Sequence, residues 1–131
     1  MSAPAHRILI VDDEPAIRGL LEFSFSSAGY VVRTAADGAS ATRLFAEQEF
    51  DLVLSDVRMP DMDGHELVRW LAENRPRTRW VLMTGYDMPC GECPLVQSCT
   101  VLQKPFRPKE AVDMVAAVLA GKPAPKLADL S

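Results

Sequence analysis

Short apolar runs recur along the chain, each bounded by polar residues and each too short to form a helix. Such runs are typical of strands that are buried on both faces of a sheet. They predict five strands, at Arg7–Val11, Tyr30–Ala35, Leu52–Leu54, Trp80–Met83 and Val101–Gln103.

The segments between these runs carry apolar residues at helical spacing. Pro15 and Pro108 suit the first turn of a helix, and Asp37 can cap another. Four helices are expected, beginning at Pro15, after Asp37, near Gly64 and at Pro108. Their expected inward faces are Ile17, Leu20, Leu21, Phe25 and Ala28, then Ala41, Leu44 and Phe45, then Leu67, Val68 and Leu71, and finally Val112, Val115, Ala116 and Leu119.

Strands that alternate with helices imply right-handed βαβ crossovers and a parallel sheet. We therefore predict an α/β fold with a doubly wound, five-stranded parallel sheet. For its strands we take the order 2-1-3-4-5, which is one of the common orders of doubly wound folds. The chain has 131 residues, enough for one domain that folds without disulfides or a structural metal. Residues 1–121 are predicted to form this domain. Residues 122–131, with two prolines and no periodicity, are predicted to form a flexible C-terminal tail.

The net charge of −4 disfavours non-specific binding to nucleic acid or to an anionic membrane surface. No apolar run approaches the roughly 20 residues of a transmembrane helix. The first apolar run is also too short for a signal peptide and ends in acidic residues. We therefore expect a cytoplasmic protein with no direct nucleic-acid or membrane partner, in which the three cysteines are mostly reduced.

Polar residues whose side chains can bind a ligand or take part in a reaction follow four of the expected strands. Asp12 and Asp13 follow the first strand, Asp56 the third, Thr84 the fourth and Lys104 the fifth. The carboxyl ends of parallel strands meet at one edge of the sheet, where ligands bind in open α/β folds. In the order 2-1-3-4-5 the first and third strands are neighbours, so the three carboxylates are expected to converge.

Three carboxylates that lie this close repel one another, and a hard divalent cation relieves the repulsion. Mg²⁺ suits such a site because it prefers a few carboxylates together with water and phosphate oxygens. Lys104 supplies a fixed positive charge and Thr84 a hydroxyl donor for an anionic group held near Asp56. The set predicts phosphoryl transfer onto a carboxylate, with Asp56 as the nucleophile.

The ordered set of motifs resembles the response-regulator receiver domain of two-component signalling, over about Arg7 to Ala120. The motifs are Asp12-Asp13, Asp56, Met59-Pro60, Asp63-Gly64, Thr84 and Lys104-Pro105-Phe106. The resemblance implies a flavodoxin-like fold and a phosphoryl group accepted from a sensor histidine kinase. It also implies a phosphoacceptor that is not an enzyme in the usual sense, with only self-directed phosphotransfer and autodephosphorylation.

The resemblance further implies how the metal is held and which residue is modified. Asp56 would be the phosphorylated residue. Asp13 and Asp56 would bind Mg²⁺ through their side chains, and Arg58 through its backbone carbonyl. Asp12 would act on the metal indirectly.

The same resemblance assigns roles around the phosphoryl group. Thr84 would move toward it as a switch, and Lys104 would form an ion pair with it. The peptide bond before Pro105 is expected to be cis. Arg58 and Tyr86 stand where the family flanks the path of the attacking water, and we expect Tyr86 to slow hydrolysis.

The stretch 85–99 departs from the family's pattern, which has a helix here. Two prolines and two glycines leave room for one helical turn at most. The fourth helix of the family is therefore predicted to be missing or reduced. Val101 also stands where the family has its switch aromatic residue. Because this region is the family's usual output surface, an unusual partner or dimer is expected.

The three cysteines lie in this stretch as Cys90-x2-Cys93-x5-Cys99. The first pair has the spacing of a metal knuckle or a redox motif. Zinc normally takes four ligands, so His65 or Asp87 would have to complete a zinc site. The alternative is that the cysteines are small buried thiols that pack beneath the loop.

Taken together, the residues and the resemblance predict a single-domain response regulator. It would accept a phosphoryl group on Asp56 and signal to an unknown downstream protein through the loop at 85–99, with a homodimer as a further option. A phosphate relay or sink would use the same chemistry. Two alternatives remain open: a pseudo-receiver that binds partners constitutively, and a redox or metal sensor that uses Cys90, Cys93 and Cys99.

Overall fold

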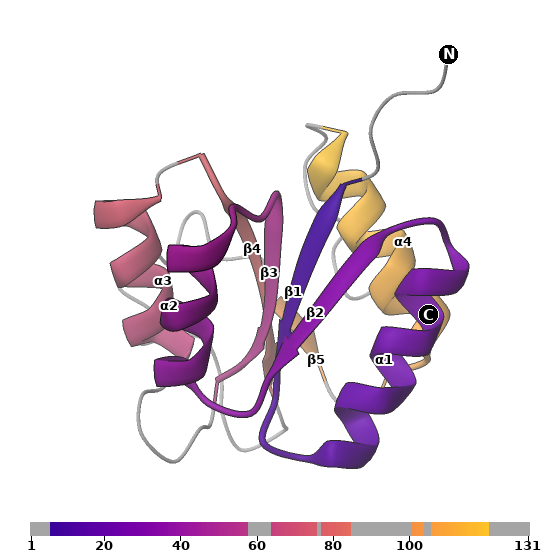
Figure 1. The fold of residues 1–131 in the computed structure, drawn as a ribbon. Helices are drawn as coiled ribbons and strands as arrows, with labels where there is room; N and C mark the ends of the chain where they lie inside the picture. The colour runs from indigo at the N-terminus through magenta and orange to yellow at the C-terminus, as the bar shows by residue number, and fades with distance from the viewer. Residues whose placement is uncertain (1–5, 58–63, 76, 85–100, 104–105, 121–131) are drawn as a thin grey trace.

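The computed structural model describes residues 6–57, 64–75, 77–84, 101–103 and 106–120. Its strands are β1 (Arg7–Val11), β2 (Val31–Ala35), β3 (Leu52–Asp56), β4 (Arg79–Thr84) and β5 (Val101–Gln103). Its helices are α1 (Pro15–Ser27), α2 (Gly38–Glu47), α3 (Gly64–Asn74) and α4 (Pro108–Leu119). The strands form one parallel sheet in the order β2-β1-β3-β4-β5, which confirms the predicted doubly wound α/β fold (Figure 1).

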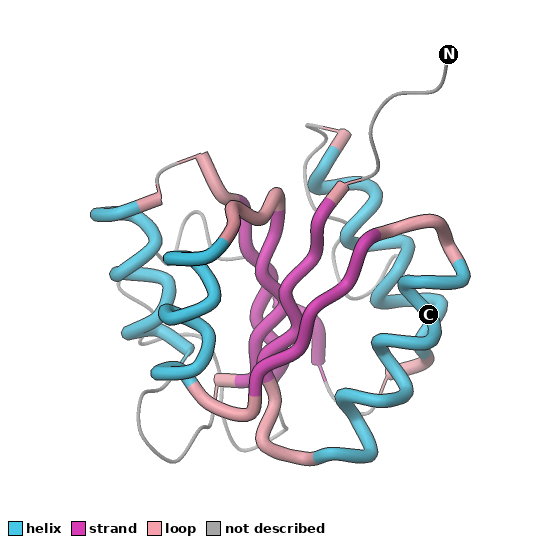
Figure 2. The backbone as a smooth tube through the Cα atoms, in the orientation of Figure 1, coloured by secondary structure: helices cyan, strands magenta, loops and turns pink. Residues whose placement is uncertain are grey.

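Helices cover both faces of the sheet, with α1 and α4 on one side and α2 and α3 on the other (Figure 2). Phe25 of α1 and Met114 of α4 lie in one buried cluster with Ile8 and Leu54 of the central strands. The opposite face buries a second cluster, which includes Phe45 of α2. A central parallel strand must fill both layers, which is why β3 is buried at all five positions.

The inward faces of α2 and α3 are as predicted. Asp37 caps α2, because its Oδ1 accepts a hydrogen bond of 2.7 Å from the Ser40 backbone N–H. Ala41 and Phe45 are buried and Leu44 is partly buried. On α3 the expected residues Leu67, Val68 and Leu71 are all buried.

The predicted stripe of α1 is too wide. Leu21 and Phe25 are buried and Ile17 packs against them, as expected. Leu20, however, is 49% exposed, and Ala28 is an exposed residue beyond the end of the helix. Leu20 lies one helical step, about 100°, away from Leu21, so a helix that contacts the sheet along a narrow line leaves it at the edge.

The predicted inward face of α4 is correct at three of its four residues. Val115 is buried as expected, but Ala116 is exposed, and Ala111 and Met114 are the other buried residues. Val112 and Leu119 are partly buried and pack against the core, as expected. The apolar stripe of α4 is wide, and packing against α1 and the sheet buries Ala111 and Met114 while it leaves Ala116 at the edge.

The predictions for two other regions lie outside the described residues. These are the missing or reduced helix in 85–99 and the flexible tail at 122–131. In the described ranges, no helix is both long enough and apolar enough to cross a lipid bilayer.

Candidate functional site

The register of the sheet brings the acidic residues to one edge. In the pairing of β1 with β3, Val11 is opposite Ser55, so Asp12 and Asp56 follow side by side. Asp56 in turn pairs with Met83 of β4, and Thr84 comes next. We call this edge, formed by the ends of β1, β3, β4 and β5, the carboxyl edge. Its location follows from the parallel order of the strands.

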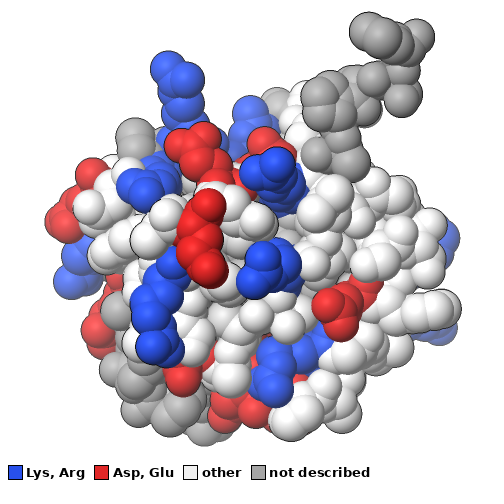
Figure 3. All heavy atoms as spheres, in the orientation of Figure 1, with Lys and Arg blue, Asp and Glu red and all other residues white. Residues whose placement is uncertain are grey.

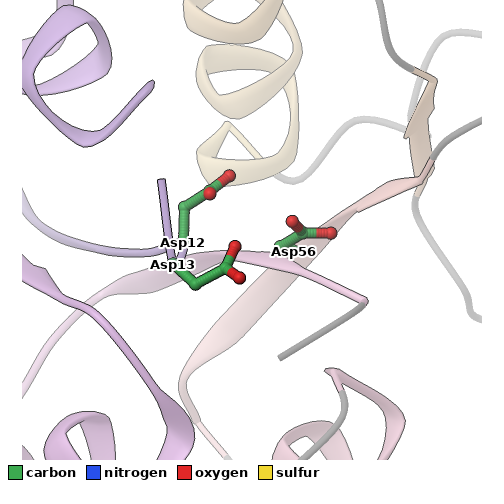
Figure 4. Close-up of side chains that lie close together, drawn as sticks. All are labelled: Asp12, Asp13 and Asp56. Carbon is green, nitrogen blue, oxygen red and sulfur yellow. The ribbon is translucent and has the colours of Figure 1, made fainter. Parts of the chain in front are cut away.

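Three carboxylates converge at the carboxyl edge. Asp12, Asp13 and Asp56 each place one carboxylate oxygen within 4.8 Å of the other two (Figure 4). Asp12 is buried and Asp56 is 8% exposed, whereas Asp13 is exposed to solvent. Charged groups gathered and partly buried in this way carry a desolvation cost that a bound cation would offset.

The backbone at the end of β1 is held on several sides. The Asp12 N–H donates to the Ala35 carbonyl oxygen at 3.1 Å, which extends the pairing with β2. The Glu14 N–H donates to Asp12 Oδ1 at 2.9 Å, so one oxygen of this carboxylate already has a backbone donor. Arg18 Nη1 donates to the Asp12 carbonyl oxygen at 2.6 Å. The turn from β1 into α1 is therefore fixed by both backbone and side-chain contacts.

The end of β3 is held in a similar way. The buried Ser55 hydroxyl donates to the Asp56 carbonyl oxygen at 2.9 Å. The Val57 N–H donates to the Met83 carbonyl oxygen at 3.0 Å, so the backbone stays attached to β4 beyond Asp56. Asp56 thus projects from a rigid strand end, which suits a side chain that must hold a defined position.

The donor set fits a hard divalent cation. All three converging groups are carboxylates, and oxygen donors are what Mg²⁺ prefers. Mg²⁺ needs only one or two protein carboxylates and keeps the rest of its octahedral shell for water and phosphate oxygens. Asp13 and Asp56 can supply these two carboxylates while Asp12 keeps its bond from the Glu14 N–H.

The structure brings together three of the residues that the sequence singled out, Asp12, Asp13 and Asp56. Thr84 ends β4 with its backbone opposite Gln103 of β5, and its side chain lies outside what the structure describes. Seven further candidates lie outside the described residues: Arg58, Tyr86, Cys90, Cys93, Cys99, Lys104 and Pro105.

Arg18 is a contact of the site that the sequence did not reveal. A half-exposed arginine one turn into a helix has the appearance of an ordinary surface residue. The available signal was its position, because the first turn of α1 follows directly on the Asp12-Asp13 pair. The neighbouring residues in the sequence do not predict that the Arg18 side chain points back to the end of β1.

Comparison with known families decides the class of this site. The family model for the response regulator receiver domain matches residues 8–116. The chain belongs to the receiver domain family. Receiver domains are signalling phosphoacceptors of two-component systems that interact with sensor histidine kinases, and they are generally not enzymes in the usual sense. In this family Mg²⁺ is bound through acidic residues, and the chain has its acidic cluster in Asp12, Asp13 and Asp56.

Curated relatives are regulators of this family. The chain is 42% identical over 81 residues to the regulatory protein AtoC of Escherichia coli, covering 62% of this chain and 18% of AtoC. It is 35% identical over 124 residues to the transcriptional regulatory protein GltR of Pseudomonas aeruginosa, covering 91% of this chain and 51% of GltR. The chain thus spans about half of the length of GltR and less than a fifth of the length of AtoC. It is 34% identical to the response regulator receiver protein CpdR of Brucella abortus, covering 86% of this chain and 96% of CpdR.

Solved receiver domains have the same fold. A CheY-like response regulator receiver domain protein from Methanospirillum hungatei superposes with a TM-score of 0.82 at 28% identity, covering 90% of this chain and 96% of that one. The response regulator TrrA of Thermotoga maritima, crystallised in complex with Mg²⁺-BeF, gives a TM-score of 0.75 at 30% identity, covering 86% of this chain and 98% of TrrA.

Proposed function

We propose that this chain is a Mg²⁺-dependent phosphoacceptor that receives a phosphoryl group from a sensor histidine kinase onto Asp56. The observation that carries the proposal is the convergence of Asp12, Asp13 and Asp56 within 4.8 Å at the carboxyl edge. Membership of the receiver domain family supports the reaction class. The Mg²⁺-BeF complex of TrrA supports the choice of metal.

In the proposed reaction an Asp56 carboxylate oxygen attacks the phosphorus of a phosphohistidine. The new O–P bond forms as the N–P bond breaks, and the electron pair of that bond leaves with the imidazole nitrogen. Asp56 suits this role because β3 holds its backbone rigidly at the site, through the contacts of Ser55 and Val57. Phosphoryl transfer depends mainly on such positioning and on neutralising charge.

Asp13 and Asp56 would hold Mg²⁺ by their side chains, together with the backbone carbonyl of Arg58, and Asp12 would act indirectly. Mg²⁺ would neutralise negative charge on the carboxylates and on the incoming phosphoryl oxygens. Asp12 fits the indirect role because its Oδ1 already accepts a hydrogen bond from the Glu14 N–H.

The remaining roles follow the family's motif positions. We assign Thr84 as the hydroxyl switch and Lys104 as the ion-pair partner of the phosphoryl group, with a cis peptide bond before Pro105. Arg58 and Tyr86 would set the lifetime of the aspartyl phosphate. Thr84 ends β4 at the same edge as Asp56, and Lys104 directly follows β5 in the sequence, which is compatible with both assignments.

The output is proposed to be contact with another protein. The coverage of 96% of CpdR, itself named a receiver protein, supports a unit that works as a receiver domain alone. Residues 1–121 would form this unit, with 122–131 as a tail. The loop at 85–99 would be the contact surface for a downstream protein or for a second copy of the chain.

The experiment that tests the proposal is the intact mass of the protein after incubation with acetyl phosphate. We expect one phosphoryl adduct with Mg²⁺, none with EDTA, and none in Asp56→Asn. Asp113→Asn is the matched control, because Asp113 is an exposed aspartate of α4 whose partner is Lys109 at 3.0 Å. This variant should be phosphorylated like the wild type.

Two results would contradict the proposal. The first is an adduct that persists in Asp56→Asn, which would place the phosphoryl group elsewhere. The second is a lack of any adduct with acetyl phosphate and also with a panel of phosphorylated histidine kinases, which would favour a pseudo-receiver.

A further inference from the structure

Arg18 turns back from α1 onto the end of β1. Its Nη1 donates to the Asp12 carbonyl oxygen at 2.6 Å, a short contact for a charged donor on a neutral carbonyl. The side chain is half-buried, and it bridges a separation of six residues. The guanidinium therefore holds the backbone beside the acidic cluster.

The carbonyl that Arg18 holds belongs to the peptide unit between Asp12 and Asp13. A peptide unit is planar, so fixing its oxygen also fixes the N–H and the start of Asp13. On the other side of Asp12, its N–H is bound to the Ala35 carbonyl oxygen at 3.1 Å. The two contacts clamp the strand end from both directions.

Asp13 depends on this clamp more than Asp56 does. Asp56 is 8% exposed and stands in a central strand that is buried at every position. Asp13 is exposed and follows the strand, so packing restrains it little. The direction of its carboxylate toward Asp56 (Figure 4) is then set mainly by the backbone from which it projects.

We propose that Arg18 is a positioning residue for the cation site: by holding the Asp12 carbonyl it aims Asp13 at the position of Mg²⁺. This inference rests on the proposed function, since it concerns the same metal. Partners that orient metal ligands typically contribute a factor of about 10 to 100 in metal affinity.

The positive charge of Arg18, taken by itself, has the opposite effect on Mg²⁺ affinity. The direction in which the affinity changes when Arg18 is removed therefore tests the inference. The guanidinium lies against Asp12, well within the roughly 8 Å over which charges interact at physiological ionic strength. As a charge alone it would repel a cation, and its removal would tighten Mg²⁺ binding. As a positioning residue, its removal weakens binding.

Isothermal titration of the full chain with MgCl₂ distinguishes the two. We expect Arg18→Ala to raise the Kd for Mg²⁺ about tenfold. Arg18→Lys, which keeps the charge but loses the planar fork, should also bind Mg²⁺ more weakly than the wild type. Arg77→Ala is the matched control, because it removes the same charge from an exposed residue before β4, at the opposite edge. Its Kd should stay within about twofold of the wild type.

A second readout does not depend on the metal. Hydrogen exchange of metal-free protein should show faster exchange of the Asp12 and Glu14 amides, which are hydrogen-bonded at this turn, in Arg18→Ala than in wild type or Arg77→Ala, because the clamp on the turn is lost. If Arg18→Ala does not fold, Arg18→Lys carries both measurements, and weaker Mg²⁺ binding with faster exchange is again the expected result.

The outcomes separate this inference from the proposed function. A wild-type chain that binds no Mg²⁺ would contradict the proposed function itself. A wild-type chain that binds Mg²⁺, with Arg18→Ala binding as well or more tightly, would overturn the role of Arg18 alone. Unchanged exchange at Asp12 and Glu14 in Arg18→Ala would overturn it as well.

Discussion

Acidic residues at the two edges of the sheet have different surroundings. At the carboxyl edge, Asp12, Asp13 and Asp56 lie within 4.8 Å of one another. At the opposite edge, where β1, β3 and β4 begin, the exposed Asp51 makes hydrogen bonds to backbone groups. Its Oδ2 accepts from the Arg7 N–H at 2.7 Å, its own N–H donates to the Arg7 carbonyl oxygen at 2.8 Å, and its carbonyl oxygen accepts from the Arg79 N–H at 3.1 Å.

Arginines at this opposite edge, which we call the amino edge, are also used structurally. Arg75 lies over the rings of Phe45 and Trp70, at 5.9 and 5.8 Å from their centroids, and donates to the Phe45 carbonyl oxygen near the end of α2. Arg79 donates to the Val118 carbonyl oxygen at the end of α4. Cations suit helix carboxyl ends, which carry unpaired carbonyls and the negative end of the dipole.

The comparison shows that an acidic residue next to a strand can have either a structural role or a place in a binding site. Asp51 ties three strand ends together, whereas Asp56 faces two other carboxylates. On the face shown in Figure 3, basic and acidic side chains are interspersed, as on an ordinary protein surface. The carboxyl edge differs because three carboxylates lie close together there, and like charges at such distances repel one another.

The largest expected effect is the response of stability to Mg²⁺. At a Mg²⁺ concentration of 100 times Kd, the free energy of unfolding should rise by about 2.7 kcal/mol, because only the folded state has the site. Asp13→Asn should lose most of this gain, and Asp51→Asn should keep it. Urea unfolding with MgCl₂ and with EDTA measures both. An equal gain in all three proteins would place the metal elsewhere.

The next largest effect is expected on stability, when Arg75 at the amino edge is replaced. Arg75→Ala should lower the free energy of unfolding by about 2 kcal/mol, because it removes two cation–π contacts and a hydrogen bond. The affinity for Mg²⁺ should not change. Urea unfolding and Mg²⁺ titration of the same sample measure the two quantities. A loss of Mg²⁺ affinity comparable to that of Arg18→Ala would mean that the two edges are coupled.

A smaller effect is expected at Asp51. Asp51→Ala should cost about 1 kcal/mol, because the exposed Arg7 N–H loses its carboxylate acceptor. Asp51→Asn should cost less, since the amide oxygen can still accept. Phosphorylation of both variants should match the wild type. Loss of the adduct in either folded variant would show that Asp51 also serves the site.

The smallest effect is expected at Asp37, an acid that follows β2 and is not part of the cluster. The Ser40 backbone and side chain, as hydrogen-bond donors, lower the pKa of Asp37 below its ordinary 3.8, because they stabilise the carboxylate. The folded state therefore favours the charged form. The stabilising contribution of Asp37 is complete above about pH 4 and is lost as the pH falls through the lower, folded-state pKa.

Asp37→Ala should therefore cost at most about 1 kcal/mol at neutral pH, and this difference from wild type should shrink below about pH 4. Urea unfolding of the two proteins between pH 3 and pH 7 measures it. A difference that grows on acidification would contradict the assigned role of the carboxylate.

The elements of the fold could be predicted because their signals are local. The continuous apolar run of β3, the proline that opens α4 and the cap at Asp37 each depend on a few neighbouring residues. Right-handed βαβ crossovers predicted a parallel sheet. The order 2-1-3-4-5, one of the common orders of doubly wound sheets, places the ends of the first and third strands side by side. The sequence could therefore predict that acids would meet at one edge.

Other features depend on distant parts of the chain, and only the tertiary structure decided them. Packing of α4 against α1 selected Met114 in place of Ala116 as a buried residue. The register of β1 with β3 set how closely Asp13 approaches Asp56. The side chain of Arg18 donates to the Asp12 carbonyl oxygen, and the sequence pattern does not predict this contact because it does not give the conformation of the turn between the two residues. Periodicity records which face of an element is apolar, whereas distances between charged atoms arise only when elements far apart in the sequence pack together.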